Sequence, residues 1–344
     1  MPDRFKIAII GEAWGEEEAL WQRPFIGNAG KQLDSLLLDA GIERNECFVT
    51  NVFNLHPDGN RLETLCGNKR DPDCLGHWPA LVPGHYLQRR YEGEIDRLLG
   101  ELEEVRPNLA VLAGNTPCWA LLERQAISKI RGTVTHSSRL PWLKCLPIYH
   151  PAAVLRQYDL RHVTVLDLIK AKREGDFPEL RRPVRELWLE PSLDDIRSFR
   201  DEYLARADCI AFDIETARGE ITCISFAGSI DRALVVPFHD GRSPTGSYWN
   251  TLSEELEAWD LVASILDLPA QKLGQNVLYD TQYLWQVYGI PVRNLAQDTM
   301  LLHHSLHPES DKGLGFLGSV YTNEPAWKTE RPRGKHETLK RDDE

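Results

Sequence analysis

The apolar positions in the first half of the chain form short runs that read as buried strands. Four such runs occupy residues 6–10, 47–49, 109–112 and 145–148. Short, nearly continuous apolar strands are typical of a parallel sheet that helices cover on both faces. The pattern therefore predicts a three-layer α/β/α domain around a four-stranded parallel sheet.

Glycine and polar residues begin where each of these runs stops. The first run leads into the sequence GEAWG at residues 11–15, the second reaches Asn51, the third Asn115 and the fourth His150. The carboxyl ends of parallel strands lie at one edge of a sheet, which is where such domains bind their ligands. We therefore expect these residues to share a site.

The second half of the chain shows a different order of elements. Residues 193–207 read as a helix, and residues 209–216 as a strand in which Asp213 and Glu215 point to the same face. Further predicted elements are strands at residues 221–226 and 233–238, a strand entering a helix at 272–280, and a helix beginning at 298–302. This order predicts a second domain built on a mixed sheet.

A charged segment with two prolines, residues 174–183, separates the two halves. The 344 residues are enough for two domains of ordinary size. We expect a first domain over residues 1–178, a linker over 179–190 and a second domain over 191–344.

The charge of the chain argues against a protein that coats nucleic acid without selectivity. The net charge is −12 and the isoelectric point is near 5.5. Residues 121–175, however, carry ten basic side chains against four acidic ones. This segment surrounds His150, so we expect phosphate contacts there, with an ordinary solvated helix face as the alternative.

The motifs of the first half resemble those of the uracil-DNA glycosylase superfamily, and most closely its family 4 branch. The similar segments are GEAWG at 11–15, PFIGNAG at 24–30, the strand end at Asn51 and HPAAVLR at 150–156. Each motif alone is weak, but their order along residues 5–175 is specific. The resemblance implies excision of uracil from single- or double-stranded DNA.

The resemblance also implies roles for individual residues. A glycosylase extrudes the target nucleotide, and Phe25 resembles the residue that stacks on the base while Asn51 resembles the reader of its edge. Bond cleavage leaves negative charge on the base and positive charge on the sugar. His150 fits the first charge, and Glu12 or Glu18 the second. Other residues implied to bind substrate are Ala13, Asn115 and Arg156.

Two departures from the family pattern bear on which base enters the pocket and on cofactors, respectively. Trp14 stands where the family has proline, and Leu55 stands where an iron–sulfur ligand is expected. With no cysteine pair before the first strand either, we expect no iron–sulfur cluster. Zinc at Cys66, Cys74 and His77 is an alternative, although their spacing matches no standard finger and favours an ordinary loop.

The remaining cysteines and the hydropathy of the chain bear on its location. Most of the seven cysteines fall in predicted strands, as buried thiols do in a reducing compartment. No signal peptide or membrane-length apolar segment is visible. We expect a cytoplasmic protein of a bacterium or a phage-infected cell, with no membrane partner.

The second half resembles the DEDD-type 3′–5′ exonuclease domain of family A DNA polymerases. Asp213 and Glu215 resemble its first motif, Asn276 and Asp280 its second, and the sequence DTM at 298–300 the segment that follows. Residues 312–321 resemble the next helix. The resemblance implies Mg²⁺ or Mn²⁺ held by Asp213, Glu215 and Asp280, with Asn276 contacting substrate.

The family's third motif is missing from the sequence. Asp342 and Asp343 lack the aromatic residue or histidine that should accompany a ligand there. We therefore expect either an incomplete exonuclease or part of a longer phage-type polymerase, whose polymerase module or subunit is a candidate partner. The competing interpretation is a module that binds DNA or a modified base without catalysis, joined to a degenerate exonuclease scaffold. In a third interpretation only the glycosylase is active.

Overall fold

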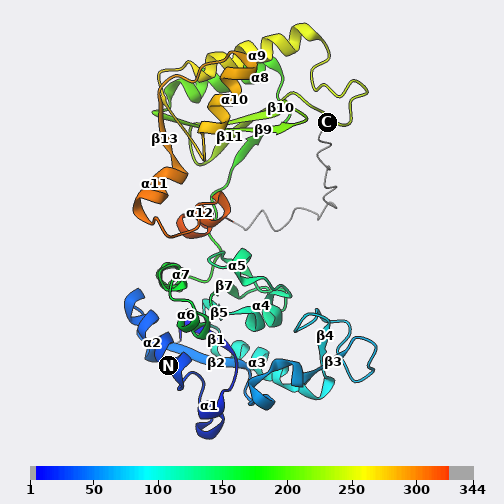
Figure 1. Cartoon of the computed structure of the whole chain (residues 1–344), viewed down its shortest axis with the longest axis vertical. Helices are drawn as coiled ribbons and strands as arrows, with labels where there is room; N and C mark the ends of the chain where they lie inside the picture. The colour runs from blue at the N-terminus through cyan, green and yellow to red at the C-terminus, as the bar shows by residue number, and fades with distance from the viewer. Residues whose placement is uncertain (1–4, 325–344) are drawn as a thin grey trace, which may run out of the picture. The chain divides into compact units, whose positions relative to one another are not determined.

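The computed structural model describes residues 5–324, which form two compact units (Figure 1). The first unit holds the residues up to 181 together with the segment from 315, and the second holds residues 182–314. The sequence interpretation had placed that last segment in the second domain. Asp342 and Asp343 lie outside the described residues.

The sheet of the first unit has the strand order β2-β1-β5-β7-β6. Its strands are β1 (Ile7–Ala13), β2 (Cys47–Phe53), β5 (Leu109–Ala113), β6 (Thr135–His136) and β7 (Lys144–Ile148). The four strands expected from the apolar runs pair in parallel, and the α/β class is confirmed. The sheet is not purely four-stranded, because β6 adds a short antiparallel edge beside β7. Two residues are too few to leave a periodic signal in the sequence.

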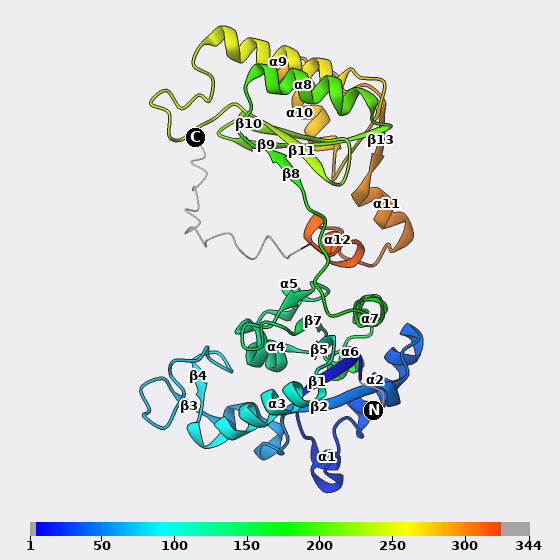
Figure 2. The same cartoon turned by 180° about the vertical axis from the view of Figure 1, so that it is seen from behind.

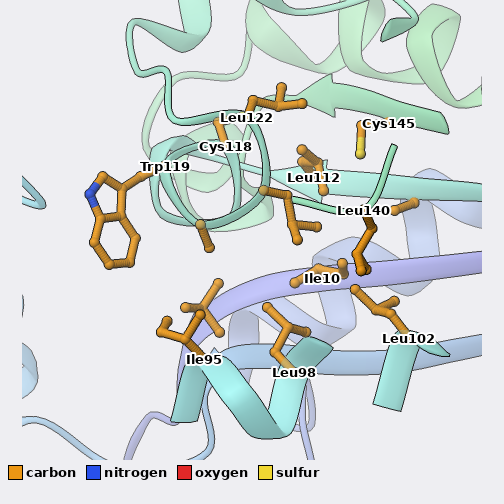
Figure 3. Packing of buried hydrophobic residues seen from close by; sticks show 14 of the residues in the cluster. Ile10, Ile95, Leu98, Leu102, Leu112, Cys118, Trp119, Leu122, Leu140 and Cys145 are labelled. Atoms are coloured by element: carbon orange, nitrogen blue, oxygen red, sulfur yellow. The ribbon is translucent and has the colours of Figure 1, made fainter. Parts of the chain in front are cut away.

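Helices cover both faces of this sheet. Ile10 belongs to the same buried cluster as Leu98 and Trp119 on one face (Figure 3). The neighbouring Ile9 packs with Leu36 in a separate cluster on the other face, as alternation along a strand requires. The helices of this unit are α1 (Glu16–Trp21), α2 (Asn28–Ala40), α3 (Glu92–Val105), α4 (Asn115–Leu122), α5 (Ile127–Ile130), α6 (Pro151–Arg156), α7 (Leu160–Glu174) and α12 (Leu314–Tyr321).

A buried polar network holds α12 against α7. Arg131 forms an ion pair with Asp167, both almost fully buried, and its Nη1 donates a hydrogen bond to Ser319 Oγ at 3.0 Å. Lys170 Nζ donates to the backbone oxygens of Gly132 at 2.8 Å and Thr322 at 2.7 Å. These bonds make the segment after residue 315 part of the first unit.

The second unit is built on a mixed sheet with the strand order β13-β12-β9-β10-β11-β8, which confirms the expected class. Its strands are β8 (Glu186–Trp188), β9 (Cys209–Ala217), β10 (Glu220–Ala227), β11 (Arg232–Pro237), β12 (Gln271–Gly274) and β13 (Leu295–Asp298). Its helices are α8 (Leu193–Glu202), α9 (Leu252–Leu266), α10 (Leu278–Tyr288) and α11 (Thr299–Leu306). Helices α8 and α9 lie side by side over one face of the sheet (Figure 2). Across the described residues, no helix is long and apolar enough to cross a bilayer.

Candidate functional site

The carboxyl ends of the four parallel strands bring distant motifs together in the first unit. Gly11 on β1 is the register partner of Asn51 on β2. Ala113 on β5 pairs with Ile148 on β7, so Gly114 and His150 follow these two strands at the same edge. The parallel pairing thereby assembles the strand-end residues that the sequence singled out.

Glycine at position 11 makes room for two of these residues. A Cβ atom on Gly11 would overlap Oδ1 of Asn51 and would lie 2.5 Å from Cζ of Phe25. Both side chains therefore lie directly over the Gly11 backbone. A Cβ on Gly30 would likewise overlap the backbone oxygen of Phe25, so α2 approaches the Phe25 loop closely only because residue 30 is glycine.

The Phe25 ring also faces His150. The two ring centroids are 5.8 Å apart and the planes are inclined by 28°. A Cβ on Gly114 would lie 3.2 Å from the His150 Cβ, so this glycine gives the imidazole its place. Phe25 is only 4% exposed and has a positive φ of 55°, a conformation that costs a non-glycine residue about 1–2 kcal/mol. Phe25, Asn51 and His150 thus form one cluster.

The environment of His150 keeps its ring neutral. Burial lowers the pKa of His150 from 6.5 to about 4; the positive charge of Arg156 acts in the same direction and the negative charge of Glu18 opposes it. His150 precedes α6, and its Nδ1 accepts a hydrogen bond from the Ala152 backbone N–H at 3.2 Å. Because Nδ1 is an acceptor, the proton of the neutral ring sits on Nε2.

Glu18 supports the loop that carries Phe25. Its Oε1 accepts hydrogen bonds from the backbone N–H groups of Ile26 at 3.2 Å and Gly27 at 3.1 Å, and the side chain is buried. From the other side, Arg44 Nη2 donates to the backbone oxygen of Phe25 at 2.9 Å. These bonds offset the strain at Phe25. Sequence reasoning anticipated neither contact, because each joins a side chain to the backbone of another segment.

The second candidate carboxylate, Glu12, is held by α4. The hydroxyl of Thr116 donates to Glu12 Oε2 at 2.6 Å. Burial raises the pKa of Glu12, and the Thr116 hydrogen bond partly opposes that rise. The next residue, Ala13, ends β1. Glu12 therefore lies at the carboxyl end of β1, and its Oε2 is hydrogen-bonded to Thr116.

The two other predicted substrate-binding residues lie on helix ends. Asn115 is exposed at the start of α4, and its Oδ1 accepts a hydrogen bond from the Ile127 backbone N–H at 2.9 Å. Arg156 is exposed at the end of α6, near enough to His150 to lower the histidine's pKa. The Arg156 guanidinium is therefore accessible to a ligand that approaches from solvent.

The insertion between β2 and α3 carries the candidate zinc ligands Cys66, Cys74 and His77. Its two short strands are β3 (Cys66–Asn68) and β4 (His85–Leu87). The Cys66 thiol donates to the Leu62 backbone oxygen at 3.4 Å, and burial, with a smaller contribution from Cys74, raises its pKa to about 12. In the described part of the chain, which includes His77, no three His, Cys, Asp or Glu side chains form a metal-binding group.

The residues present do not fit an iron–sulfur cluster either. Leu55, which occupies an expected ligand position, packs its side chain against the core of the first unit. Its backbone oxygen accepts a hydrogen bond from the backbone N–H of Trp14 at 3.1 Å. An aliphatic side chain supplies no thiolate to iron.

Three acidic residues of the second unit, Asp213, Glu215 and Asp280, lie on or beside β9. Asp213 and Glu215 are exposed on one face, and the alternate residues Phe212 and Ile214 are buried. Asp280, on α10, is buried and its Oδ1 accepts the Ile214 backbone N–H at 2.9 Å. Burial, with the neighbouring charge of Asp213, raises the pKa of Asp280 to about 6. The described residues nevertheless include no preformed group of three metal ligands.

Asn276 precedes α10 in a position fixed by its backbone. Its N–H donates to Asp298 Oδ1 at 3.0 Å, and the N–H of Val277 donates to Oδ2 at 2.9 Å. Asp298 Oδ1 also accepts the Met300 N–H at 2.8 Å, which caps α11. The Asp298 carboxylate therefore joins the starts of two helices.

Comparisons with known proteins match the first unit to a family. Residues 1–171 match the family model described as "Uracil DNA glycosylase superfamily". A type-4 uracil-DNA glycosylase of Thermotoga maritima is 30% identical over 174 residues, which cover 48% of this chain and 76% of the relative. That of Archaeoglobus fulgidus is 34% identical over 169 residues, covering 46% and 71%.

Three further proteins show more distant similarity to the chain. A DNA polymerase of Bacillus phage SP01 is 23% identical over 222 residues, which cover 62% of this chain and 21% of the polymerase. Among solved structures, Escherichia coli RNase D has a TM-score of 0.31 at 17% identity, covering 41% of this chain and 34% of its own. The EXO domain of Aedes aegypti Nibbler has a TM-score of 0.30 at 19% identity, covering 43% and 77%.

Proposed function

This chain belongs to the uracil-DNA glycosylase superfamily, and on that premise we propose that its first unit excises uracil from DNA by hydrolysing the N-glycosidic bond. The observation that carries the proposal is the cluster of Phe25, Asn51 and His150 over Gly11 and Gly114. An aromatic ring and an amide are groups that recognise a flipped base. A neutral imidazole can stabilise the negative charge on the base as it leaves.

Each member of the cluster has a separate task in this proposal. Phe25 stacks on the extruded base, and the Asn51 amide bonds its Watson–Crick edge. His150 donates from Nε2 to the base oxygen as negative charge develops there. A neutral donor with a pKa near 4 remains a donor across the physiological pH range.

The groups around the cluster act on the sugar and the phosphates. Glu12, whose orientation Thr116 fixes, faces the positive charge that develops on the sugar. Glu18 holds the Phe25 loop in place. We assign Ala13 and Asn115 to the wall of the base pocket and the exposed Arg156 to a phosphate contact.

The proposal is tested with single-stranded DNA that contains one uracil, in EDTA, followed by alkali to reveal abasic sites. The wild-type protein is expected to produce strand breaks at the uracil without added metal. His150→Ala should reduce the rate by about 100-fold and leave DNA binding nearly unchanged. Tight binding of uracil DNA with no abasic sites would favour the alternative, a module that recognises a base without removing it.

A second function, in the second unit, is favoured by the buried carboxylate of Asp280. A buried acid whose pKa is raised beside another acid is stabilised when a cation binds. We propose that Asp213, Glu215 and Asp280 bind Mg²⁺ or Mn²⁺ weakly, near a DNA end that Asn276 contacts. A bound cation supplies activation of water and stabilisation of the leaving 3′ oxygen. A polymerase module or subunit, as a partner, would complete the ligand set.

Calorimetric titration with Mn²⁺ tests this second proposal. Weak binding by the wild-type protein should disappear in Asp280→Asn and persist in the exposed control Asp260→Asn on α9. Equal binding by both variants would place the cation elsewhere. Efficient Mg²⁺-dependent trimming of DNA from its 3′ end would show that the site is already complete.

A further inference from the structure

The strand that carries Asn51, β2, is at the edge of its sheet, so its position depends on contacts other than strand pairing on its outer side. β2 pairs with β1 on one side and, within the part of the chain that the structure describes, has no partner strand on the other. The outward-facing backbone groups of an edge strand need partners other than a neighbouring strand. At the end of β2, α3 supplies these partners through its side chains.

Arg97 on α3 makes the central contacts. Its Nη2 donates to the backbone oxygens of Asn51 at 2.9 Å and Val52 at 3.1 Å. Its Nε donates to Glu94 of the same helix at 3.2 Å, and its Nη1 donates to Glu101 at 2.7 Å and to the Thr50 hydroxyl at 3.4 Å. The guanidinium is thereby fixed in plane and orientation.

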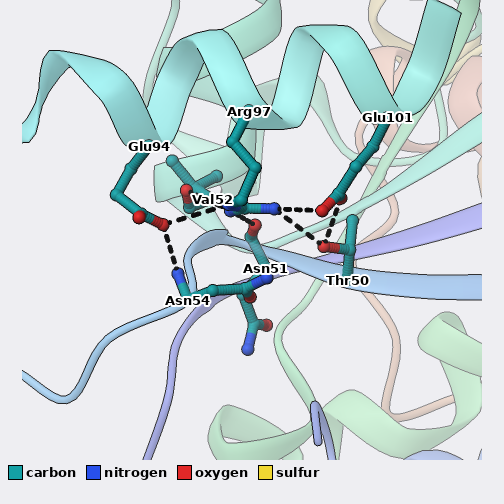
Figure 4. Close-up of polar contacts among 7 residues, drawn as sticks. All are labelled: Thr50, Asn51, Val52, Asn54, Glu94, Arg97 and Glu101. Carbon is teal, nitrogen blue, oxygen red and sulfur yellow. Dashed lines mark hydrogen bonds and ion pairs between the residues drawn. The ribbon is translucent and has the colours of Figure 1, made fainter. Parts of the chain in front are cut away.

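The same two acids contact β2 and the residue that follows it, on either side of Asn51. Glu94 Oε2 accepts the Asn54 backbone N–H at 2.7 Å, and Glu101 Oε2 accepts the Thr50 hydroxyl at 2.8 Å. Figure 4 shows this Arg97 network, composed of Arg97, Glu94 and Glu101, lying along the strand. The network donates to two backbone carbonyls and accepts from one N–H, as a neighbouring strand would.

The Asn51 side chain points away from this network (Figure 4). It faces Gly11 and Phe25 on the opposite side of the sheet, and among residues 5–324 its amide makes no hydrogen bond. The backbone of Asn51 is therefore held firmly while its amide remains available for a ligand. This combination is what a preorganised recognition group requires.

We propose that Arg97 is a positioning residue for base recognition, which rests on the proposed excision of uracil and acts through Asn51. Partly exposed ion pairs contribute little to stability, and the Arg97, Glu94 and Glu101 side chains are each about a quarter exposed. The value of the network is therefore geometric. Displacing the Asn51 amide by a fraction of an ångström weakens bonds that form only when the base is in place.

Three variants test the proposal by two independent readouts. Arg97→Met keeps the aliphatic stem and removes every donor, whereas Arg97→Lys keeps the charge but cannot bond two carbonyls in one plane. Arg89→Met is the matched control, since Arg89 is 59% exposed just before the same helix. The readouts are amide hydrogen exchange in the peptide covering residues 47–54, and single-turnover release of uracil.

Arg97→Met is expected to accelerate exchange in that peptide and to slow single-turnover release about 10- to 100-fold, with the KM for DNA changed less than about threefold. Arg97→Lys should fall between it and the wild type, and Arg89→Met should match the wild type. The double variant Asn51→Ala/Arg97→Met should be no slower than Asn51→Ala alone, because Arg97 acts through Asn51.

Unchanged exchange and release in Arg97→Met would overturn the proposal. A double variant slowed by the product of the two single effects would do so too, since it would reveal a general structural role. If the wild-type protein released no uracil while Arg97→Met still accelerated exchange, the excision assignment would fail and the positioning of Asn51 would stand.

Discussion

A Cβ atom on Gly11 would overlap the side-chain oxygen of Asn51, its register partner on the neighbouring strand. The amide proposed to read the base thus occupies space that only a glycine leaves open. The ring edge of Phe25 uses the same space. The geometry of the candidate site therefore depends on a backbone position as much as on the side chains that carry the chemistry.

Gly11→Ala should displace both Asn51 and Phe25. We expect a loss of uracil release of more than about 100-fold and a drop in the free energy of unfolding of about 1–3 kcal/mol from overpacking. The matched control is Gly100→Ala on α3, where a Cβ would meet nothing within 4 Å. That change should stabilise the helix by about 0.5–1 kcal/mol and leave activity intact. Chemical unfolding and a rate assay measure the two effects, and an active Gly11→Ala protein would contradict the arrangement.

Glu18 can be assigned to support or to catalysis by a pair of substitutions. Glu18→Gln keeps an oxygen that can accept the Ile26 and Gly27 N–H groups, whereas Glu18→Ala removes it. A supporting role predicts less than about a tenfold loss of uracil release for the glutamine and a far larger loss for the alanine. Equal losses would mean that the negative charge of Glu18 acts on the reaction itself.

The lowered pKa of His150 predicts that the free energy of unfolding depends on pH. Between pH 6.5 and about pH 4 the unfolded chain binds a proton at this residue and the folded protein does not. The free energy of unfolding should therefore fall as the pH decreases through this window, by up to about 3 kcal/mol, and change no further at this residue below it. His150→Gln should flatten that part of the profile. Urea unfolding at several pH values measures the slope, and identical profiles for the two proteins would contradict a neutral His150 ring in the folded protein.

The buried pair of Arg131 and Asp167 predicts a large effect far from the base pocket. Asp167→Asn leaves the Arg131 charge without its partner in a buried site and should lower the free energy of unfolding by about 3–5 kcal/mol. Asp159→Asn, an exposed change just before the same helix, should have an effect below about 0.5 kcal/mol. Similar melting temperatures for the two variants would show that the network around α12 contributes little.

The strand-end residues can be predicted from the sequence because a buried parallel strand leaves a local pattern in it. An apolar run followed by glycine, asparagine or histidine marks the carboxyl end of a buried strand, and the sheet then brings Asn51 and His150 together. The contacts that hold the site leave no such trace. Arg97 meets the Asn51 backbone across 46 residues, and Arg44 meets Phe25 across 19. A side chain bonded to a distant carbonyl creates neither a period nor a motif.

Other features escaped prediction for related reasons. The helix α12 follows the second domain in sequence, yet hydrogen bonds from Lys170 and Arg131 connect it to the first unit. These residues are far from α12 in the sequence. Glu18 has the residue type expected near a sugar, but its partners are backbone N–H groups of the loop that follows its helix. Residue type indicates what chemistry a side chain can do, and only the fold determines which partner it has.

The central claim is that the cluster of Phe25, Asn51 and His150 removes uracil, and the most direct measurement is the free base itself. Single-stranded DNA carrying one labelled uracil is incubated with the 344-residue chain in EDTA, and released uracil is separated from DNA by chromatography. We predict one uracil released per strand by the wild-type protein, with release by Asn51→Ala slowed about 100-fold or more. DNA that the wild-type protein binds but leaves intact, with no free uracil at any enzyme concentration, would contradict the account.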